Sequence, residues 1–184
     1  MVGGGEEGLS VAASPVRLNL GCGPKLLEGW VNVDFESNHS RRKPDVSADL
    51  RDLPFSDGYA DEAMAIHVLE HFYLWETRAV LQEWVRVLKP GGTLAIEVPC
   101  LDKVVEFLRR GETNLKYTLL PLYGDPTHQD PAMCHRWCFS KALLHKFMSD
   151  FLEDVREERP LFHFPERDMR MVGVKSKGAQ SCTA

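Results

Sequence analysis

Two short segments hold residue types that could bind a nucleoside. An apolar run at residues 16–20 stops at a turn that contains Gly21 and Gly23, and a second run at 30–33 ends in Asp34. A strand that stops at a Gly-x-Gly turn lets a ligand approach bare main-chain N–H groups. A carboxylate at the tip of the neighbouring strand can accept two hydrogen bonds from a ribose diol. The spacing therefore predicts half of a nucleoside-binding site.

The nearest alternative is a nicotinamide dinucleotide site. That site needs the pattern G-x-G-x-x-G, and here Leu26 stands at the third glycine position. Asp34 also follows the glycines too closely, because the acid of a dinucleotide site usually comes about 20 residues later. Both departures count against a dinucleotide.

Histidines and cysteines raise the question of a metal site. Residues 67–71, His-Val-Leu-Glu-His, match the inverted zinc-peptidase motif H-x-x-E-H. That motif must lie within a helix, whereas His67 ends an apolar run typical of a buried strand. A second group of donor side chains fits no zinc spacing; its members are Asp125, His128, Asp130, Cys134, His135 and Cys138. We therefore expect no bound metal, and we expect His128 or His135 to bind an acceptor.

The elements that must position these residues alternate between strands and helices. Such alternation favours a mostly parallel sheet covered on both faces, a Rossmann-like doubly wound α/β fold. Residues 158–168 show no helical period, so the last two strands should form a hairpin and the final strand should be antiparallel. The expected strands are 16–20, 30–33, 45–50, 62–68, 93–98, 154–157 and 169–175, and the expected helices are 76–88, 101–110 and 140–150.

The first crossover is unusually short. Only residues 24–29 separate the first two strands, and a parallel crossover normally needs about a dozen residues or more. The first helix should therefore be shortened to one turn or replaced by a loop. This would leave the nucleoside site open on one side, or leave it to be covered by the tails or by a partner chain in a homo-oligomer.

Composition limits the classes of partner and compartment. The 184 residues carry a net charge of −5, which disfavours a protein that grips nucleic acid by its phosphates. The five cysteines contain no C-x-x-C pair, so reduced thiols in the cytoplasm are expected. No apolar run approaches the roughly 20 residues of a membrane span. We expect one domain at 15–175 between flexible tails at 1–14 and 176–184.

One long segment is irregular. Residues 112–138 contain several prolines, histidines and aromatic residues but no clear period. An irregular segment of this length inside a compact domain is often a lid or a binding loop. We therefore expect it to roof the ligand crevice, which in open α/β sheets lies at the carboxyl ends of the strands.

Five motifs taken together resemble the small class I S-adenosylmethionine-dependent methyltransferases, in particular the bacterial type 11 kind. The order and spacing of the motifs carry the resemblance, which is specific within residues 16–99. It implies a seven-stranded sheet with an antiparallel last strand, and S-adenosylmethionine as cofactor. The motifs are LNLGCG (18–23), VNVDF (31–35), ADLRDLPF (48–55), AIHVLEHF (65–72) and LQEWVRVLKPGGTLAIEVP (81–99).

The resemblance also implies roles for single residues. The turn after Leu20, which is formed by Gly21, Cys22 and Gly23, would hold the methionine end of the cofactor. Asp34 would bind the ribose hydroxyls, with Phe35 against the adenine. Asp49 and Leu50 would read the adenine edge, and His67 would line the floor near the sulfonium.

The expected function is methyl transfer to oxygen or nitrogen of a small-molecule or saccharide-type acceptor. A hydroxyl or ammonium acceptor must lose a proton, and a histidine of near-neutral pKa is a natural base. The candidates are His67, His128 and His135. Two alternatives stay open: a catalytically idle module that binds the cofactor and regulates a partner, and a protein or RNA methyltransferase. The sequence disfavours a protein or RNA methyltransferase, because residues 67–70 read His-Val-Leu-Glu where amino-methylating enzymes often show an Asn-Pro-Pro-Tyr type of signature.

Overall fold

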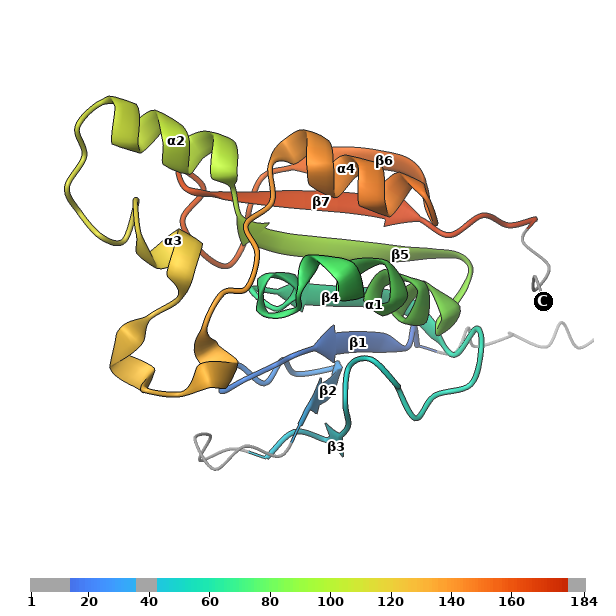
Figure 1. Cartoon of the computed structure of the whole chain (residues 1–184). Helices are drawn as coiled ribbons and strands as arrows, with labels where there is room; N and C mark the ends of the chain where they lie inside the picture. Colours follow the sequence, from blue (N-terminus) through green and yellow to red (C-terminus); the bar gives the residue numbers. More distant parts are fainter. Residues whose placement is uncertain (1–13, 36–42, 179–184) are drawn as a thin grey trace, which may run out of the picture.

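The fold is a seven-stranded sheet in the order β3-β2-β1-β4-β5-β7-β6 (Figure 1). The computed structural model describes residues 14–35 and 43–178. Most of the two expected tails, and residues 36–42, lie outside these described residues. The strands are β1 (Arg17–Leu20), β2 (Val31–Asp34), β3 (Val46–Ser47), β4 (Ala60–Ile66), β5 (Leu88–Pro99), β6 (Glu153–Glu158) and β7 (Asp168–Val174).

The sheet is mixed in the way the sequence predicted. The pairs β1–β2, β1–β4, β2–β3 and β4–β5 are parallel, whereas β7 is antiparallel to both β5 and β6. The expected hairpin and the antiparallel last strand are confirmed, since the connection between β6 and β7 holds no helix among its fully described residues.

Within residues 14–35 and 43–178, four α-helices and three 3₁₀ turns accompany the strands. Helices α1 and α4 pack on one face of the sheet, where Trp84 and Phe139 are fully buried in the main core. Helix α4 begins at the expected cap, because the Ser140 hydroxyl accepts a hydrogen bond from the N–H of Leu143. The elements are α1 (Leu74–Arg86), α2 (Leu101–Arg109), α3 (Leu120–Tyr123), α4 (Lys141–Ser149), η1 (Leu69–His71), η2 (Pro126–His128) and η3 (Pro131–Met133).

Loops cover part of the opposite face. Leu27, Trp30 and Phe162 pack there against a small cluster centred on Met64 and Val172. Residues 21–30, all of them described, form a loop instead of a helix between β1 and β2. This confirms the expected loss of the first helix. The physical reason is length, because the chain must return to the start of the adjacent parallel strand within ten residues.

Several strand boundaries differ from those expected. The fourth strand was expected over 62–68 but spans Ala60–Ile66, so His67 follows the strand. The third strand was expected over 45–50 but ends at Ser47. The N–H of Ala48 makes a last hydrogen bond to the carbonyl of Asp34, where β2 ends, and the chain then turns at 49–52. The fifth strand begins earlier than expected, since Leu88 already pairs with Ala60. The preceding helix therefore ends at Arg86.

The carboxyl ends of β1 and β5 point toward the irregular segment 112–138, which is drawn in yellow and orange at that end of the sheet (Figure 1). The segment holds only α3, η2 and η3. None of the helices in the described part of the chain is both long enough and apolar enough to span a membrane.

Candidate functional site

The turn after β1 folds back over the end of β2. The N–H groups of Gly21 and Cys22 both donate to the carbonyl of Val33, at 2.8 and 3.1 Å. Gly21 and Gly23 have positive φ angles of 66° and 49°, a region that side chains other than glycine rarely adopt. A Cβ on Gly21 would also lie 2.4 Å from Cγ2 of Val68. Only glycine therefore fits at position 21.

The Asp34 carboxylate sits directly beside this turn. One oxygen accepts the N–H of Gly23 at 2.6 Å and the other accepts the N–H of Phe35 at 2.8 Å. Burial raises the pKa of Asp34 and outweighs these two hydrogen bonds, which lower it. Each carboxylate oxygen has a second lone pair, so the group can still accept two hydrogen bonds from a diol. The Phe35 ring is 54% exposed at the strand tip.

Asp49 and Leu50 follow β3 next to Asp34, but their polar groups already have partners. The Asp49 carboxylate pairs with Arg51 at 2.7 Å, and this guanidinium lowers the pKa of Asp49. The carbonyl of Leu50 accepts the indole N–H of Trp84 at 3.0 Å, and the Leu50 side chain is buried. The structure thus brings these two residues to the expected edge of the sheet and gives Leu50 a packing role there.

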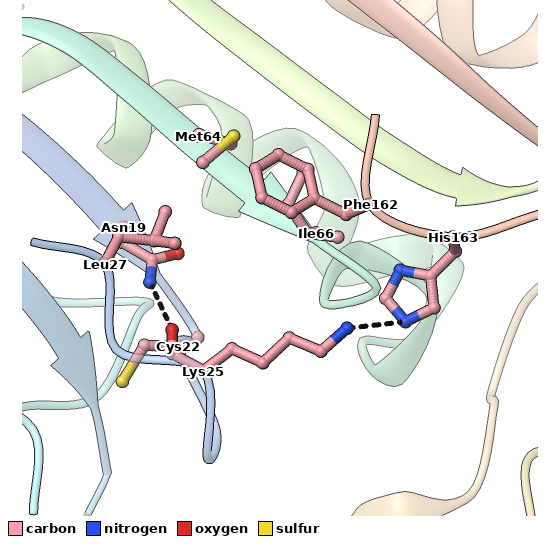
Figure 2. Close-up of a pocket in the computed structure, with 9 residues that line it drawn as sticks. Asn19, Cys22, Lys25, Leu27, Met64, Ile66, Phe162 and His163 are labelled. Atoms are coloured by element: carbon pink, nitrogen blue, oxygen red, sulfur yellow. Dashed lines mark hydrogen bonds between the residues drawn. The ribbon is translucent and has the colours of Figure 1, made fainter. Parts of the chain in front are cut away.

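The turn at residues 21–22 also lines a pocket. Its volume is about 300 Å³, including the open space at its mouth. Figure 2 shows the Lys25 side chain extending along it to His163, with Nζ and Nε2 3.3 Å apart. Asn19 supports the turn by donating to the Lys25 carbonyl at 3.0 Å. The lining residues are Asn19, Gly21, Cys22, Lys25, Leu27, Met64, Ile66, Phe162 and His163. The Cys22 thiol is buried, which raises its pKa to about 11 and keeps it protonated.

His67 follows β4 and is held between two carboxylates. Its Nδ1 lies 3.1 Å from Glu70 and its Nε2 lies 3.1 Å from Asp168, and both acids are fully buried. Burial alone would lower the pKa of His67, but the two acids outweigh it and raise the pKa to about 9. His67 is therefore a cation at neutral pH, and its φ of 54° places it in the left-handed region.

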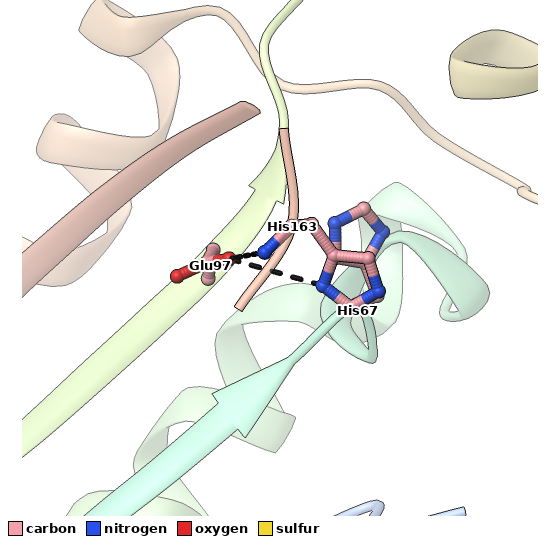
Figure 3. Close-up of side chains that lie close together, drawn as sticks. All are labelled: His67, Glu97 and His163. Atoms are coloured by element: carbon pink, nitrogen blue, oxygen red, sulfur yellow. Dashed lines mark hydrogen bonds and ion pairs between the residues drawn. The ribbon is translucent and has the colours of Figure 1, made fainter. Parts of the chain in front are cut away.

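A second buried acid fixes the loop beside His67. The Glu97 carboxylate accepts the N–H groups of residues 161, 162 and 163, at 2.9 to 3.2 Å. His163 from this loop lies against His67, with ring centroids 4.1 Å apart, and Figure 3 shows both rings beside Glu97. Burial and the positive charge of His67 lower the pKa of His163 to about 4. The loop thus presents a neutral imidazole to the pocket.

His135 and His71 lie beside each other next to the buried Glu70. The ring centroids of the two histidines are 4.9 Å apart, and Nε2 of His135 lies 4.0 Å from Oε1 of Glu70. Burial lowers the pKa of His135. The third candidate base, His128, closes η2, but its side chain lies outside the described part of the structure.

Several residues around the site were not expected from the sequence. They are Lys25, Glu97, Phe162, His163 and Asp168. One signal was available: Glu97 is the only charged residue in the apolar run 93–98, and an acid inside a buried strand must find partners. Nothing in the sequence pattern identifies the partners themselves.

The residues after β1 and β2 fit an adenosyl cofactor. Space is open at Gly23, where an added Cβ would meet no described heavy atom within 4 Å. Asp34 retains free acceptor positions beside that space, Phe35 offers an exposed ring, and the Lys25 ammonium stands in the adjoining pocket. These groups are complementary to a diol, a flat base and a carboxylate, respectively.

Comparisons with known proteins agree with the fold. Residues 18–96 match the model of the family described as "Methyltransferase domain". A curated relative, the O-methyltransferase resE of Aspergillus sclerotiorum, is 47% identical over 55 residues, which are 30% of this chain and 20% of that protein. The chain thus spans a small part of that relative.

Solved structures share the fold of this chain. A methyltransferase of Thermotoga maritima, described as a possible histamine N-methyltransferase, aligns with a TM-score of 0.61 at 17% identity. The alignment covers 90% of this chain and 84% of the Thermotoga chain. Human N-acetylserotonin methyltransferase with bound S-adenosylmethionine has a TM-score of 0.57 at 14% identity, covering 88% of this chain and 48% of its own. With the family match over residues 18–96 and this strand order, the chain contains a region similar to a methyltransferase domain and has the fold of S-adenosylmethionine-dependent methyltransferases.

Proposed function

We propose that this chain transfers a methyl group to oxygen or nitrogen of a small-molecule or saccharide-type acceptor. The observation that carries the proposal is the Asp34 carboxylate, fixed at the glycine turn with free acceptor positions toward open space. The names of two similar proteins support this choice of acceptor atom: one is an O-methyltransferase and the other a possible histamine N-methyltransferase.

In this proposal the ends of the first three strands hold the cofactor. Leu20, Gly21, Cys22 and Gly23 form the turn that accommodates the amino-acid end, and the Lys25 ammonium pairs with its carboxylate. The Asp34 carboxylate binds the ribose diol. When bound, S-adenosylmethionine supplies an electrophilic methyl group on a positively charged sulfur.

The adenine lies between Phe35 and the residues after β3. The exposed Phe35 ring offers a stacking face, and Asp49 with Leu50 forms the opposite edge. Arg51 fixes the Asp49 carboxylate by hydrogen bonds from its Nε and Nη2, so this edge is rigid before ligand binds.

In this proposal His67 holds the carboxylates of Glu70 and Asp168 in place, and His135 accepts the proton that the methyl acceptor loses. With a pKa of about 9, His67 already carries a proton at neutral pH and cannot take another. His135 has a lowered pKa, so its imidazole is neutral. Its Nδ1 lies 2.9 Å from the Pro121 carbonyl, which can only accept, so Nδ1 carries the hydrogen and Nε2 keeps a lone pair. His128 stays a predicted second base from the same segment.

The segment 112–138 selects the acceptor. Its chain is tied to η1 by hydrogen bonds from the N–H groups of Arg136 and Trp137 to the Glu70 carbonyl, at 2.8 and 3.2 Å. This contact holds the segment beside the exit of β4, at the end of the sheet where β1 and β5 finish (Figure 1). A ligand in an open α/β sheet binds at that end, which supports the proposed role of the segment. Holding acceptor and donor in line there accounts for much of the rate enhancement.

The test has two stages. Isothermal titration with S-adenosylmethionine and S-adenosylhomocysteine should give saturable binding, and absence of binding would contradict the proposal. Transfer of a labelled methyl group is then measured across hydroxyl, amine and saccharide acceptors. Turnover on any of these supports the enzyme, whereas binding without turnover across the panel indicates the regulatory module.

A further inference from the structure

We propose that Glu70, His71 and His135 form a binding site for a divalent cation. One ligand atom from each of these three residues lies within 4.8 Å of the others. Two come from the 3₁₀ turn after β4 and the third from the segment 112–138. The sequence alone led us to expect no metal, because the H-x-x-E-H pattern is not on a helix; the structure uses only the last two residues of that pattern.

The carboxylate of Glu70 is the first argument. It is 0% exposed, and neither of its oxygens accepts a hydrogen bond from any described residue. His67 Nδ1 lies 3.1 Å from one oxygen, so the pair interacts by charge without an aligned hydrogen bond. Leaving buried carboxylate oxygens without hydrogen bonds is costly, and a bound cation would give the Glu70 carboxylate a second charged partner beside His67.

Glu97 provides the contrast. This acid is also 0% exposed and also lies near two histidines, His67 and His163. Its oxygens, however, accept three main-chain N–H groups from the loop at 161–163. Glu97 is therefore satisfied by the fold, whereas Glu70 is not.

The histidines are oriented as metal ligands usually are. His135 Nδ1 lies 2.9 Å from the Pro121 carbonyl and His71 Nδ1 lies 3.2 Å from the Cys134 carbonyl. A carbonyl can only accept, so Nδ1 carries the hydrogen in both rings and Nε2 retains the lone pair. Ligating histidines almost always donate their other N–H to a carbonyl or carboxylate in this way.

Main-chain contacts bring the third ligand into place. The N–H of His135 donates to the Tyr123 carbonyl at 3.2 Å, and the next two N–H groups donate to the carbonyl of Glu70. The guanidinium of Arg136 also donates to the His71 carbonyl. These bonds hold His135 against residues 70 and 71 although they are 64 or more positions apart in the chain.

Two imidazoles and one carboxylate suit a first-row divalent ion. Zinc and iron(II) use this donor set at catalytic sites, with further positions left for water or substrate. The distances would have to shorten to about 2.0–2.2 Å from the ion. If the proposed methyl transfer holds, a hydroxyl of the acceptor bound to this ion would release its proton to solvent water more readily. The lone pair of His135 would then hold the ion and would not accept that proton.

Cobalt(II) is a suitable probe because its bound form absorbs visible light. The full chain is treated with chelator, and cobalt(II) is titrated with detection by ligand-field absorption and calorimetry; zinc(II) is then used to displace it. We expect saturable binding by the wild type. We expect H71A, H135A and E70Q to weaken it roughly 10-fold or more, and H145A to leave it unchanged, since His145 is an exposed residue of α4.

The outcomes separate this site from the proposed function. Absence of cobalt and zinc binding by the wild type overturns the site and leaves His135 as the base. Equal binding by H135A and the wild type overturns it as well. Circular dichroism checks that each variant folds, and H135Q is measured in place of H135A if H135A unfolds. S-adenosylmethionine affinity is measured in parallel for the wild type and each variant. A wild type that binds cobalt(II) but not S-adenosylmethionine would contradict the methyltransferase proposal and leave the metal site standing.

Discussion

The main-chain N–H of Gly23 donates a 2.6 Å hydrogen bond to the Asp34 carboxylate. This bond joins the turn after β1 to the end of β2, so the two halves of the candidate cofactor site are fixed to each other before any ligand binds. The same carboxylate also accepts the N–H of Phe35 at 2.8 Å. The predictions below begin from this contact.

Removing the Asp34 side chain should weaken cofactor binding strongly. We expect D34A to raise the Kd for S-adenosylmethionine by roughly 10- to 100-fold, because a hydrogen bond to a charged group contributes about 1.5–3 kcal/mol. D34N should lie between D34A and the wild type. Isothermal titration measures the affinity, and D57A, an exposed acid before β4, is the control. Unchanged affinity in D34A would contradict the proposed cofactor site.

Alanine should be tolerated far less well at Gly21 than at Gly23. Both residues have positive φ, which costs about 1–2 kcal/mol for alanine. At position 21 the new Cβ would also lie 2.4 Å from Val68, whereas at position 23 it meets nothing within 4 Å. Overpacking should add about 1–3 kcal/mol to the cost of G21A. Urea unfolding of the two variants measures the difference, and equal stability would contradict the packing described here.

Asp168 should make the protein sensitive to acid. Burial alone would raise its pKa, but hydrogen bonds from His67 and Arg167 outweigh burial and lower the pKa from 3.8 to about 2. Its ionised form therefore stabilises the fold above about pH 4, and this contribution, roughly 2 kcal/mol, is lost as pH falls through 2.

The variant D168N isolates this effect. At neutral pH it should be about 3–5 kcal/mol less stable than the wild type, because the buried partners His67 and Arg167 lose their anion. Between pH 4 and 2 its stability should fall less steeply than that of the wild type. Denaturant unfolding across this range measures both effects, with D57N as the control. Parallel pH curves for D168N and the wild type would contradict the assignment.

Glu97 should control the loop at residues 161–163. E97Q replaces one acceptor oxygen by an NH₂ group that faces main-chain donors, which should cost about 1–3 kcal/mol of stability. The pocket beside Phe162 and His163 should become less ordered, so S-adenosylmethionine affinity should fall as well. E166Q changes an exposed acid of the same loop and serves as the control. Thermal unfolding and titration report the two effects, and a variant as stable as E166Q would count against this role.

Local patterns explain what could be predicted. Asp34 and the glycine turn were found because neighbouring parallel strands end at the same edge, so two motifs a few residues apart must meet there. The missing first helix followed from the length of the first crossover, and the antiparallel last strand from the absence of a helical period after β6.

The strand boundaries were less predictable. The strand after residue 44 is shorter than its composition suggested, because its partner β2 ends at Asp34 and the chain turns at 49–52. Leu88 joins β5 because Ala60 lies opposite it. In both cases a partner from another part of the chain decides the conformation.

By itself, the sequence determined the succession of the strands along the chain, the antiparallel last strand, the glycine turn, the acid at the tip of β2 and the resemblance to a methyltransferase domain. Only the tertiary structure decided the state of the histidines. His67 lies 3.1 Å from Glu70 and 3.1 Å from Asp168, an acid 101 residues away, and these two acids make it a cation. His135 reaches the buried Glu70 through main-chain contacts of a long irregular segment. The physical reason is that charge state and hydrogen-bond satisfaction depend on neighbours brought together by folding, and no local period records them.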